Sequence, residues 1–157
     1  MANDYTKQLK ASKDFFNRST NVLTEADSGF KPKDGTWTVA QQVAHAAQTL
    51  EWFVQGASRP AGFDMDFDKL GKEVEAVTSL TDARKWMDRA YTVAMDFTEQ
   101  QGTAGMEKPL PAGPIMGGRP VGEIVWAMVE HTAHHRGALT VYSRLLGRVP
   151  EMPYGMG

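Results

Sequence analysis

The sequence contains no cysteine, which excludes disulfide bridges, thiolate catalysis and cysteine-ligated zinc sites. Basic residues are scattered, and 17 Lys and Arg against 19 Asp and Glu give a formal net charge of −2 at pH 7. Because this balance argues against an extended phosphate-binding surface, we expect no nucleic-acid partner. The sequence also lacks an apolar signal segment and any apolar run of about 18 residues, so we expect a cytoplasmic protein without a membrane partner.

The composition is otherwise that of an ordinary globular protein, with 41% hydrophobic and 23% charged residues. A length of 157 residues is typical of one domain, so we predict a single domain over residues 1–157. Apolar residues recur every three or four positions in four segments, and no strand pattern is convincing. The predicted helices cover residues 4–25, 38–57, 79–102 (starting at Ser79 or Thr81) and 120–147. This pattern predicts an all-α four-helix bundle with long crossover loops.

The predicted second helix opens with a Thr38-x-x-Gln41 capping box. After that helix, residues 63–68 alternate apolar and acidic side chains but lack the Asp-x-Asp-x-Asp-Gly frame of a calcium loop. We interpret them as a surface loop that places an apolar side chain against the bundle, with a short helix beginning near Asp66. The candidate apolar side chains are Phe63, Met65 and Phe67.

The connection over residues 102–119 is rich in glycine and proline and leads directly into the last predicted helix. Loops of this length without secondary structure are usually functional or mobile, so the segment is a candidate lid. A plain crossover between distant helix ends explains it equally well.

Three of the four histidines lie in the last predicted helix, where apolar side chains form a stripe about 80° wide. His131 and His135 lie in the middle of this stripe. Because helix residues four apart have Cβ atoms about 6 Å apart, both imidazoles can reach one metal ion. The other members of the stripe are Val121, Ile124, Met128, Leu139, Tyr142 and Leu146, and we expect Tyr142 to be a core residue with its hydroxyl hydrogen-bonded.

Two interpretations of this pair stay open. A histidine on an apolar helix face is commonly a core residue, but two in register each need a buried partner of their own. Spacing therefore favours a metal site without identifying the metal. His134, three residues after His131, forms a weaker rival pair with it. His45 lies at the flank of the second helix's apolar stripe, where periodicity indicates only a boundary residue.

No general base accompanies the histidine pair. Thr132 occupies the position of the glutamate in the His-Glu-x-x-His motif of metalloproteases. Glu123 and Glu130 lie about 80–100° from His131 around the helix, so we expect them to face solvent or a partner. The sequence therefore identifies no catalytic residue.

The opposite face of the same helix combines Trp126 with Ala133, Gly137 and Arg144. Small residues allow close approach of another backbone, and a tryptophan is large for a solvated face. We predict a homodimer contact there. Cover by the first helix or by the 102–119 loop is the alternative.

Residues 37–45 (WTVAQQVAH) and 131–142 (HTAHHRGALTVY) resemble the DinB/YfiT-like family of metal-binding four-helix bundles. The second stretch is the more specific of the two, and helix order and length fit over nearly the whole chain. The resemblance implies that His45, His131 and His135 bind one divalent metal, zinc or nickel. It also implies a homodimer, which this family commonly forms.

Relatives in that family include thiol-dependent S-transferases and isomerases. The resemblance therefore implies a metal-dependent enzyme with a small-molecule substrate and a low-molecular-weight thiol as cosubstrate. A three-histidine site suits zinc or nickel and leaves a coordination position open, and His134 then flanks the ligands. The alternative is a stress-associated bundle without turnover, in which the metal is structural or regulatory.

Overall fold

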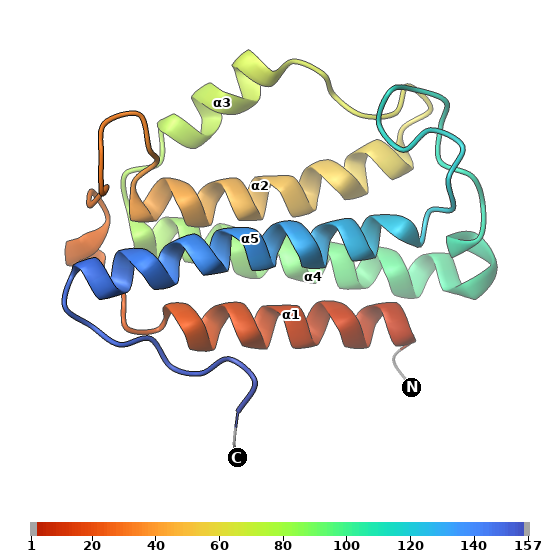
Figure 1. Ribbon diagram of the computed structural model, residues 1–157. Coiled ribbons are helices and arrows are strands. Elements are labelled where there is room, and N and C mark those ends of the chain that lie inside the picture. The colour runs from red at the N-terminus through yellow and green to blue at the C-terminus, as the bar shows by residue number, and fades with distance from the viewer. Residues whose placement is uncertain (1–2, 156–157) are drawn as a thin grey trace.

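Four long helices form the core: α1 (Asp4–Thr20), α2 (Val39–Ser58), α4 (Leu80–Met106) and α5 (Glu123–Leu145). They are seen in a computed structural model that describes residues 3–155 and contains no strand in that range. α1 and α2 each pack against both α4 and α5, so α1 and α2 lie diagonally opposite one another. In Figure 1, α1 and α5 run in one direction, and α2 and α4 run in the other. The predicted four-helix bundle is confirmed.

Two connections cross the bundle between diagonal helices, α1 to α2 and α4 to α5. The first contains the 3-10 helix η1 (Glu25–Asp27). The connection from α2 to α4, which are neighbouring helices, contains α3 (Phe67–Glu75), and α3 packs against α2 on the outside of the bundle (Figure 1). None of the helices within residues 3–155 has the length and apolar character needed to cross a lipid bilayer.

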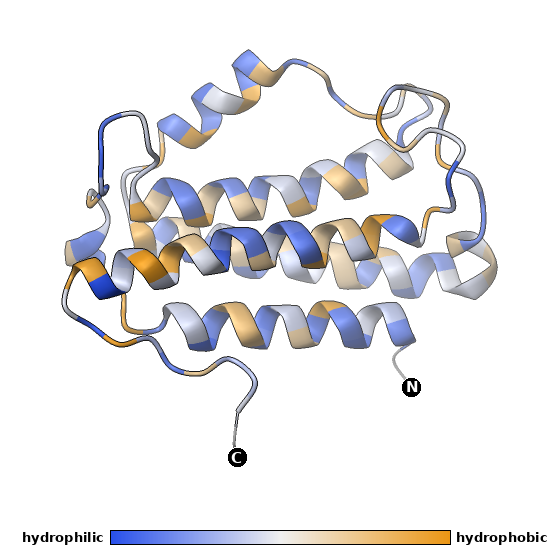
Figure 2. Cartoon of the chain, in the orientation of Figure 1, coloured by the Kyte–Doolittle hydropathy of each residue, from blue (hydrophilic) through white to orange (hydrophobic). Residues whose placement is uncertain are grey.

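The core lies between the inner faces of the four helices. Figure 2 shows that each long helix carries both hydrophobic and hydrophilic residues, as amphipathic bundle helices do. Every predicted member of the α5 stripe is buried or half-buried. Fully buried side chains from the four helices include Leu9, Phe16, Val43, Leu50, Met87, Ala94, Ile124 and Leu139.

Helix boundaries differ from the sequence prediction at three places. α1 ends at Thr20. There the Arg84 guanidinium donates to the Thr20 carbonyl at 2.7 Å and so gives a hydrogen-bond partner to one of the carbonyls that a helix end leaves without one. α4 continues to Met106, although Gly102 interrupts it with non-helical backbone angles (φ 59, ψ 179). α5 begins at Glu123 rather than Pro120, because the backbone N–H groups of residues 121 and 122 bond to residues 108 and 106 instead.

Capping interactions mark the start of α2 and the end of α5, and the capping box predicted at Thr38 is confirmed. The Thr38 hydroxyl accepts from Gln41 N, and Gln41 Oε1 accepts from Thr38 N, so the capping box at the start of α2 is complete. At the other end of the chain, Gly147 adopts φ +75 after α5. Its N–H and that of Arg148 return to the carbonyls of residues 144 and 143, which is a Schellman motif. After Gly147, residues 148–155 form no helix.

Of the three apolar side chains expected to place residues 63–68 against the bundle, Phe63 does so. Its ring centroid lies 4.6 Å from that of Trp52, and the ring lies so close over Gly56 that no side chain fits there. Met65 and Phe67 are exposed by 43% and 57%. Asp66 caps α3 by accepting from Lys69 N, which confirms the short helix predicted near this residue.

Candidate metal centre

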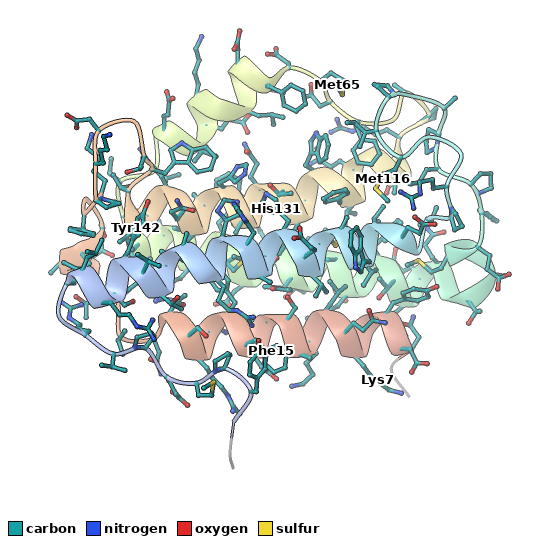
Figure 3. The ribbon with its side chains drawn as sticks, in the orientation of Figure 1. Lys7, Phe15, Met65, Met116, His131 and Tyr142 are labelled. Carbon is teal, nitrogen blue, oxygen red and sulfur yellow. The ribbon has the colours of Figure 1, made fainter. Side chains whose placement is uncertain are left out.

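His45, His131 and His135 meet where α2 packs against α5, as Figure 3 shows for His131. Their ligand nitrogens all lie within 4.8 Å of one another, and no other group of three potential metal ligands occurs within residues 3–155. The aspartates of residues 64–68 therefore form no such group. Periodicity placed His45 at the flank of its helix, and only tertiary packing brings it to the other two.

His134 lies outside this cluster. It is exposed, and its ring meets that of His135 edge-on at 5.0 Å between centroids. Side chains three positions apart on α5 diverge enough to send His134 toward solvent while His131 faces α2. The rival pairing of His131 with His134 is thus not part of the converging group.

A chain of hydrogen bonds fixes the orientation of His135. The Tyr142 hydroxyl donates to the Trp37 carbonyl at 2.9 Å and accepts from Gln42 Nε2 at 3.2 Å. Gln42 Oε1 therefore faces His135 Nδ1, at 2.6 Å, and accepts a hydrogen bond from its N–H. This tautomer leaves the lone pair of His135 on Nε2, the atom turned toward His131. Sequence reasoning missed Gln42, although it lies one turn before His45 on α2.

The donor geometry fits a tetrahedral metal. His131 Nε2 and His135 Nε2 lie 3.2 Å apart. Two imidazole nitrogens bound to zinc at tetrahedral angles lie about 3.3 Å apart. His131 Nδ1 is buried and has no hydrogen-bond partner among the described residues.

Burial keeps all three histidines neutral at pH 7. It lowers the pKa of His45 and of His131 to about 4, with neighbouring histidines contributing less. It lowers the pKa of His135 to about 3 for the same reasons. Imidazole binds metals in its neutral form, so the cluster needs no deprotonation step at physiological pH.

A cavity of about 500 Å³ lies beside the histidines, between α2, α3 and α5. His45 and His131 form part of its wall, and exposed Phe67, Trp126 and Glu130 bring it to the surface. Glu130, which we expected to face solvent or a partner, thus belongs to this wall. The remaining lining residues are Trp37, Gln48, Thr49, Trp52, Phe53, Leu70, Gly71 and Ala127.

The candidate lid does not cover this cavity. No residue of the 102–119 connection lines it, whereas Phe67, Leu70 and Gly71 of α3 do. The connection is instead tied to itself by a bond from Leu110 N to the Arg119 carbonyl at 2.8 Å. The plain crossover interpretation therefore fits the structure, and α3 covers the cavity.

The fold and the cluster define a class: a four-helix bundle that gathers three neutral histidines from two helices beside an apolar cavity. A family model described as the DinB superfamily matches residues 8–139. The chain belongs to this superfamily.

The solved structure of YfiT from Bacillus subtilis is similar over 92% of this chain and 86% of that chain, with a TM-score of 0.70 and 15% sequence identity. YfiT is described as "a probable metal-dependent hydrolase with an unusual four-helix bundle topology". At this identity the likeness shows a shared fold. A comparison with curated protein sequences gives no significant match.

Proposed function

We propose that the protein is a metal-dependent enzyme in which His45, His131 and His135 hold one divalent ion, zinc or nickel. The observation that carries this proposal is the convergence of three imidazoles on a cavity that reaches the surface. Structural zinc sites are usually enclosed by four protein ligands, whereas catalytic sites have three and keep one position for water or substrate. The description of YfiT as a "probable metal-dependent hydrolase" supports the same class of activity.

A divalent ion in such a site supplies a Lewis acid that polarises a substrate oxygen and lowers the pKa of water or of a thiol. The chain's own residues do the rest. Gln42 holds His135 in the tautomer that presents Nε2. Trp37 packs over His45, with ring centroids 4.2 Å apart, and limits the access of water from that side. The apolar cavity wall orients the substrate against His45 and His131.

Hydrolysis, with water as the nucleophile, is the reaction we favour. The cavity wall, as far as the described residues form it, contains no lysine or arginine that would hold the carboxylate groups of a low-molecular-weight thiol. Thiol S-transfer or isomerisation is the second candidate. It is supported by the sequence resemblance and by the absence of an evident general base, because a metal-lowered thiol pKa supplies the nucleophile directly.

The test begins with metal content, measured by plasma mass spectrometry on tag-free protein after incubation with zinc or nickel. We expect about one ion per chain, as a mononuclear three-histidine site requires. A His131→Ala/His135→Ala variant should lose the ion, whereas His134→Ala should keep it. Absence of metal in the wild type, or its retention in the double variant, contradicts the proposal.

A second measurement separates an enzyme from a bundle with a structural metal. Chelation should leave the helical circular dichroism unchanged if the site is catalytic, and unfold the protein if the ion holds the fold together. The metal-loaded protein is then tested with neutral aryl esters, and separately with a thiol and an electrophile. Turnover in the first assay supports hydrolysis, and turnover only in the second supports thiol transfer.

A further inference from the structure

We propose that the cavity beside the histidines selects an organic cation: a small molecule with an apolar body and a positively charged group, recognised by Glu130 and aromatic side chains. This inference rests on the proposed function, because it names the substrate class of the same site. It concerns charge selection, which neither the family nor the fold assigns.

The wall of the cavity is dominated by aromatic rings. They come from the start of α2, from its middle, from α3 and from α5, and comprise Trp37, Trp52, Phe53, Phe67 and Trp126. The faces of such rings carry negative electrostatic potential and attract ammonium groups within about 6 Å of the ring centroid. A ligand surrounded by these rings gains both from burial of its apolar body and from cation–π attraction.

The donor groups of Trp52 and Gln48 in the wall are already hydrogen-bonded. The Trp52 indole N–H is already bonded to the Asp64 carbonyl at 2.8 Å. Gln48 Nε2 is bonded to the Leu70 carbonyl at 3.0 Å and to Glu73 Oε2 at 2.9 Å, which leaves its Oε1 as an acceptor. A ligand that brings donors or a positive charge therefore finds acceptors in Gln48 Oε1 and the Glu130 carboxylate.

Glu130 is the only acidic residue in the lining, and no lysine or arginine of the described residues accompanies it there. Its carboxylate makes no ion pair or hydrogen bond with any of residues 3–155. Two other glutamates of the bundle differ in this respect: Glu123 pairs with Arg119 at 2.6 Å, and Glu51 accepts from Trp86 Nε1 at 2.9 Å. Glu130 thus leaves an uncompensated negative charge at the cavity.

The position of Glu130 on α5 places its carboxylate beside the Trp126 ring at the mouth of the cavity. Trp126 lies four residues before Glu130, so both side chains project from the same side of the helix one turn apart. Trp126 is 68% exposed although it lines the cavity, which places its indole at the opening. Ala127, between the indole and His131 along the wall, leaves the space that a larger residue would fill.

Titration with three probes of similar size tests the proposal: benzyltrimethylammonium, its neutral analogue neopentylbenzene, and phenylacetate. Binding is followed by the tryptophan indole N–H signals in NMR spectra, first on metal-free protein, where a carboxylate cannot coordinate an ion. We expect the cation to bind most tightly and the anion most weakly. Glu130→Gln should weaken binding of the cation about three- to tenfold and leave the neutral probe unchanged.

Glu123→Gln is the matched control, because this carboxylate lies on the same helix but outside the cavity, and it should change no affinity. Ala127→Phe should reduce binding of all probes by filling the cavity, with unchanged helical circular dichroism. Equal affinity for cation and neutral probe, tighter binding of the anion, no effect of Glu130→Gln, or no binding at all overturns the proposal.

Metal content, measured on the same samples, separates the two proposals. If zinc binds and cation selectivity is absent, the charge selection is wrong and the metal site stands. If the cation binds selectively and zinc does not bind, the cavity is a cation site and the metal-dependent function is wrong. Selectivity retained in zinc-loaded protein supports both.

Discussion

Gln42 Oε1 lies 2.6 Å from His135 Nδ1, and this contact determines which nitrogen of His135 remains free. The hydrogen bonds of Tyr142 determine that the oxygen of the Gln42 amide, and not its nitrogen, faces His135. The Trp37 carbonyl can only accept, so Tyr142 donates to it and must accept from Gln42. The orientation of one imidazole is thereby tied to the backbone at the entry of α2.

Replacing Gln42 with leucine should weaken metal binding. Loss of the acceptor leaves His135 Nδ1–H buried and frees the ring to rotate, and removing such a partner typically costs about 10- to 100-fold in metal affinity. Tyr142→Phe should have a smaller effect in the same direction, because Gln42 then loses its anchor. Zinc affinity is measured by competition with a chelating dye. Gln55→Leu, at an exposed position of the same helix, serves as the control. Unchanged affinity in Gln42→Leu contradicts the assigned role.

Metal-free protein should lose stability as the pH falls from 7 to 5. Burial lowers the pKa of His45 and of His131 from 6.5 to about 4. Between these values the unfolded chain binds more protons than the folded one, so stability that is complete above pH 6.5 is lost as the pH falls toward 4. Urea unfolding midpoints at several pH values test this. A His45→Gln/His131→Gln/His135→Gln variant should show a weaker pH dependence, and an identical dependence would show that other groups cause it.

Loss of Arg148 should destabilise the fold. Its guanidinium donates to both carboxylate oxygens of Asp27 and to the Val22 carbonyl, and the Asp27 side chain is only 6% exposed. These bonds hold the pKa of Asp27 below its usual value. Removing one partner of a buried pair costs about 3–5 kcal/mol, and we expect about 2–3 kcal/mol for Arg148→Met because Arg148 is 37% exposed.

The free energy of unfolding in urea measures this effect. Arg144→Met is a suitable control, because Arg144 is exposed and bonds only to a carbonyl of its own helix. Equal stability of the two variants would mean that the Arg148–Asp27 pair contributes nothing net.

The homodimer stays a prediction. Trp126 is 68% exposed, as an interface residue would be in an isolated chain. Ala133 and Gly137, however, line a hollow whose other side is formed by tail residues 149–154. Trp126→Glu should convert dimers to monomers in sedimentation velocity, whereas Val93→Glu, at an exposed position on α4, should not. A monomeric wild type would show that Trp126 serves the cavity mouth alone.

Periodicity in the sequence determined the four helices, the position of His131 and His135 on the inner face of α5, and the capping box at Thr38. These features are local, because each depends on residues within one or two helical turns. Boundaries were less predictable where the chain bonds to distant residues. α1 ends early because the Arg84 guanidinium of α4 bonds to the Thr20 carbonyl. α5 begins late because the N–H groups of residues 121 and 122 bond to the carbonyls of residues 108 and 106, at the end of α4 and just after it.

The family resemblance named His45 beside His131 and His135, and only the tertiary structure shows how the three meet. His45 reaches the other two histidines because α2 packs against α5, a relation between residues about 90 positions apart that single-helix periodicity does not contain. The same packing brings Gln42 to His135 and places Glu130, which is exposed as expected, in the wall of the cavity. Local sequence thus sets which residues share a helix face, and the angle and order of helix packing set which faces meet.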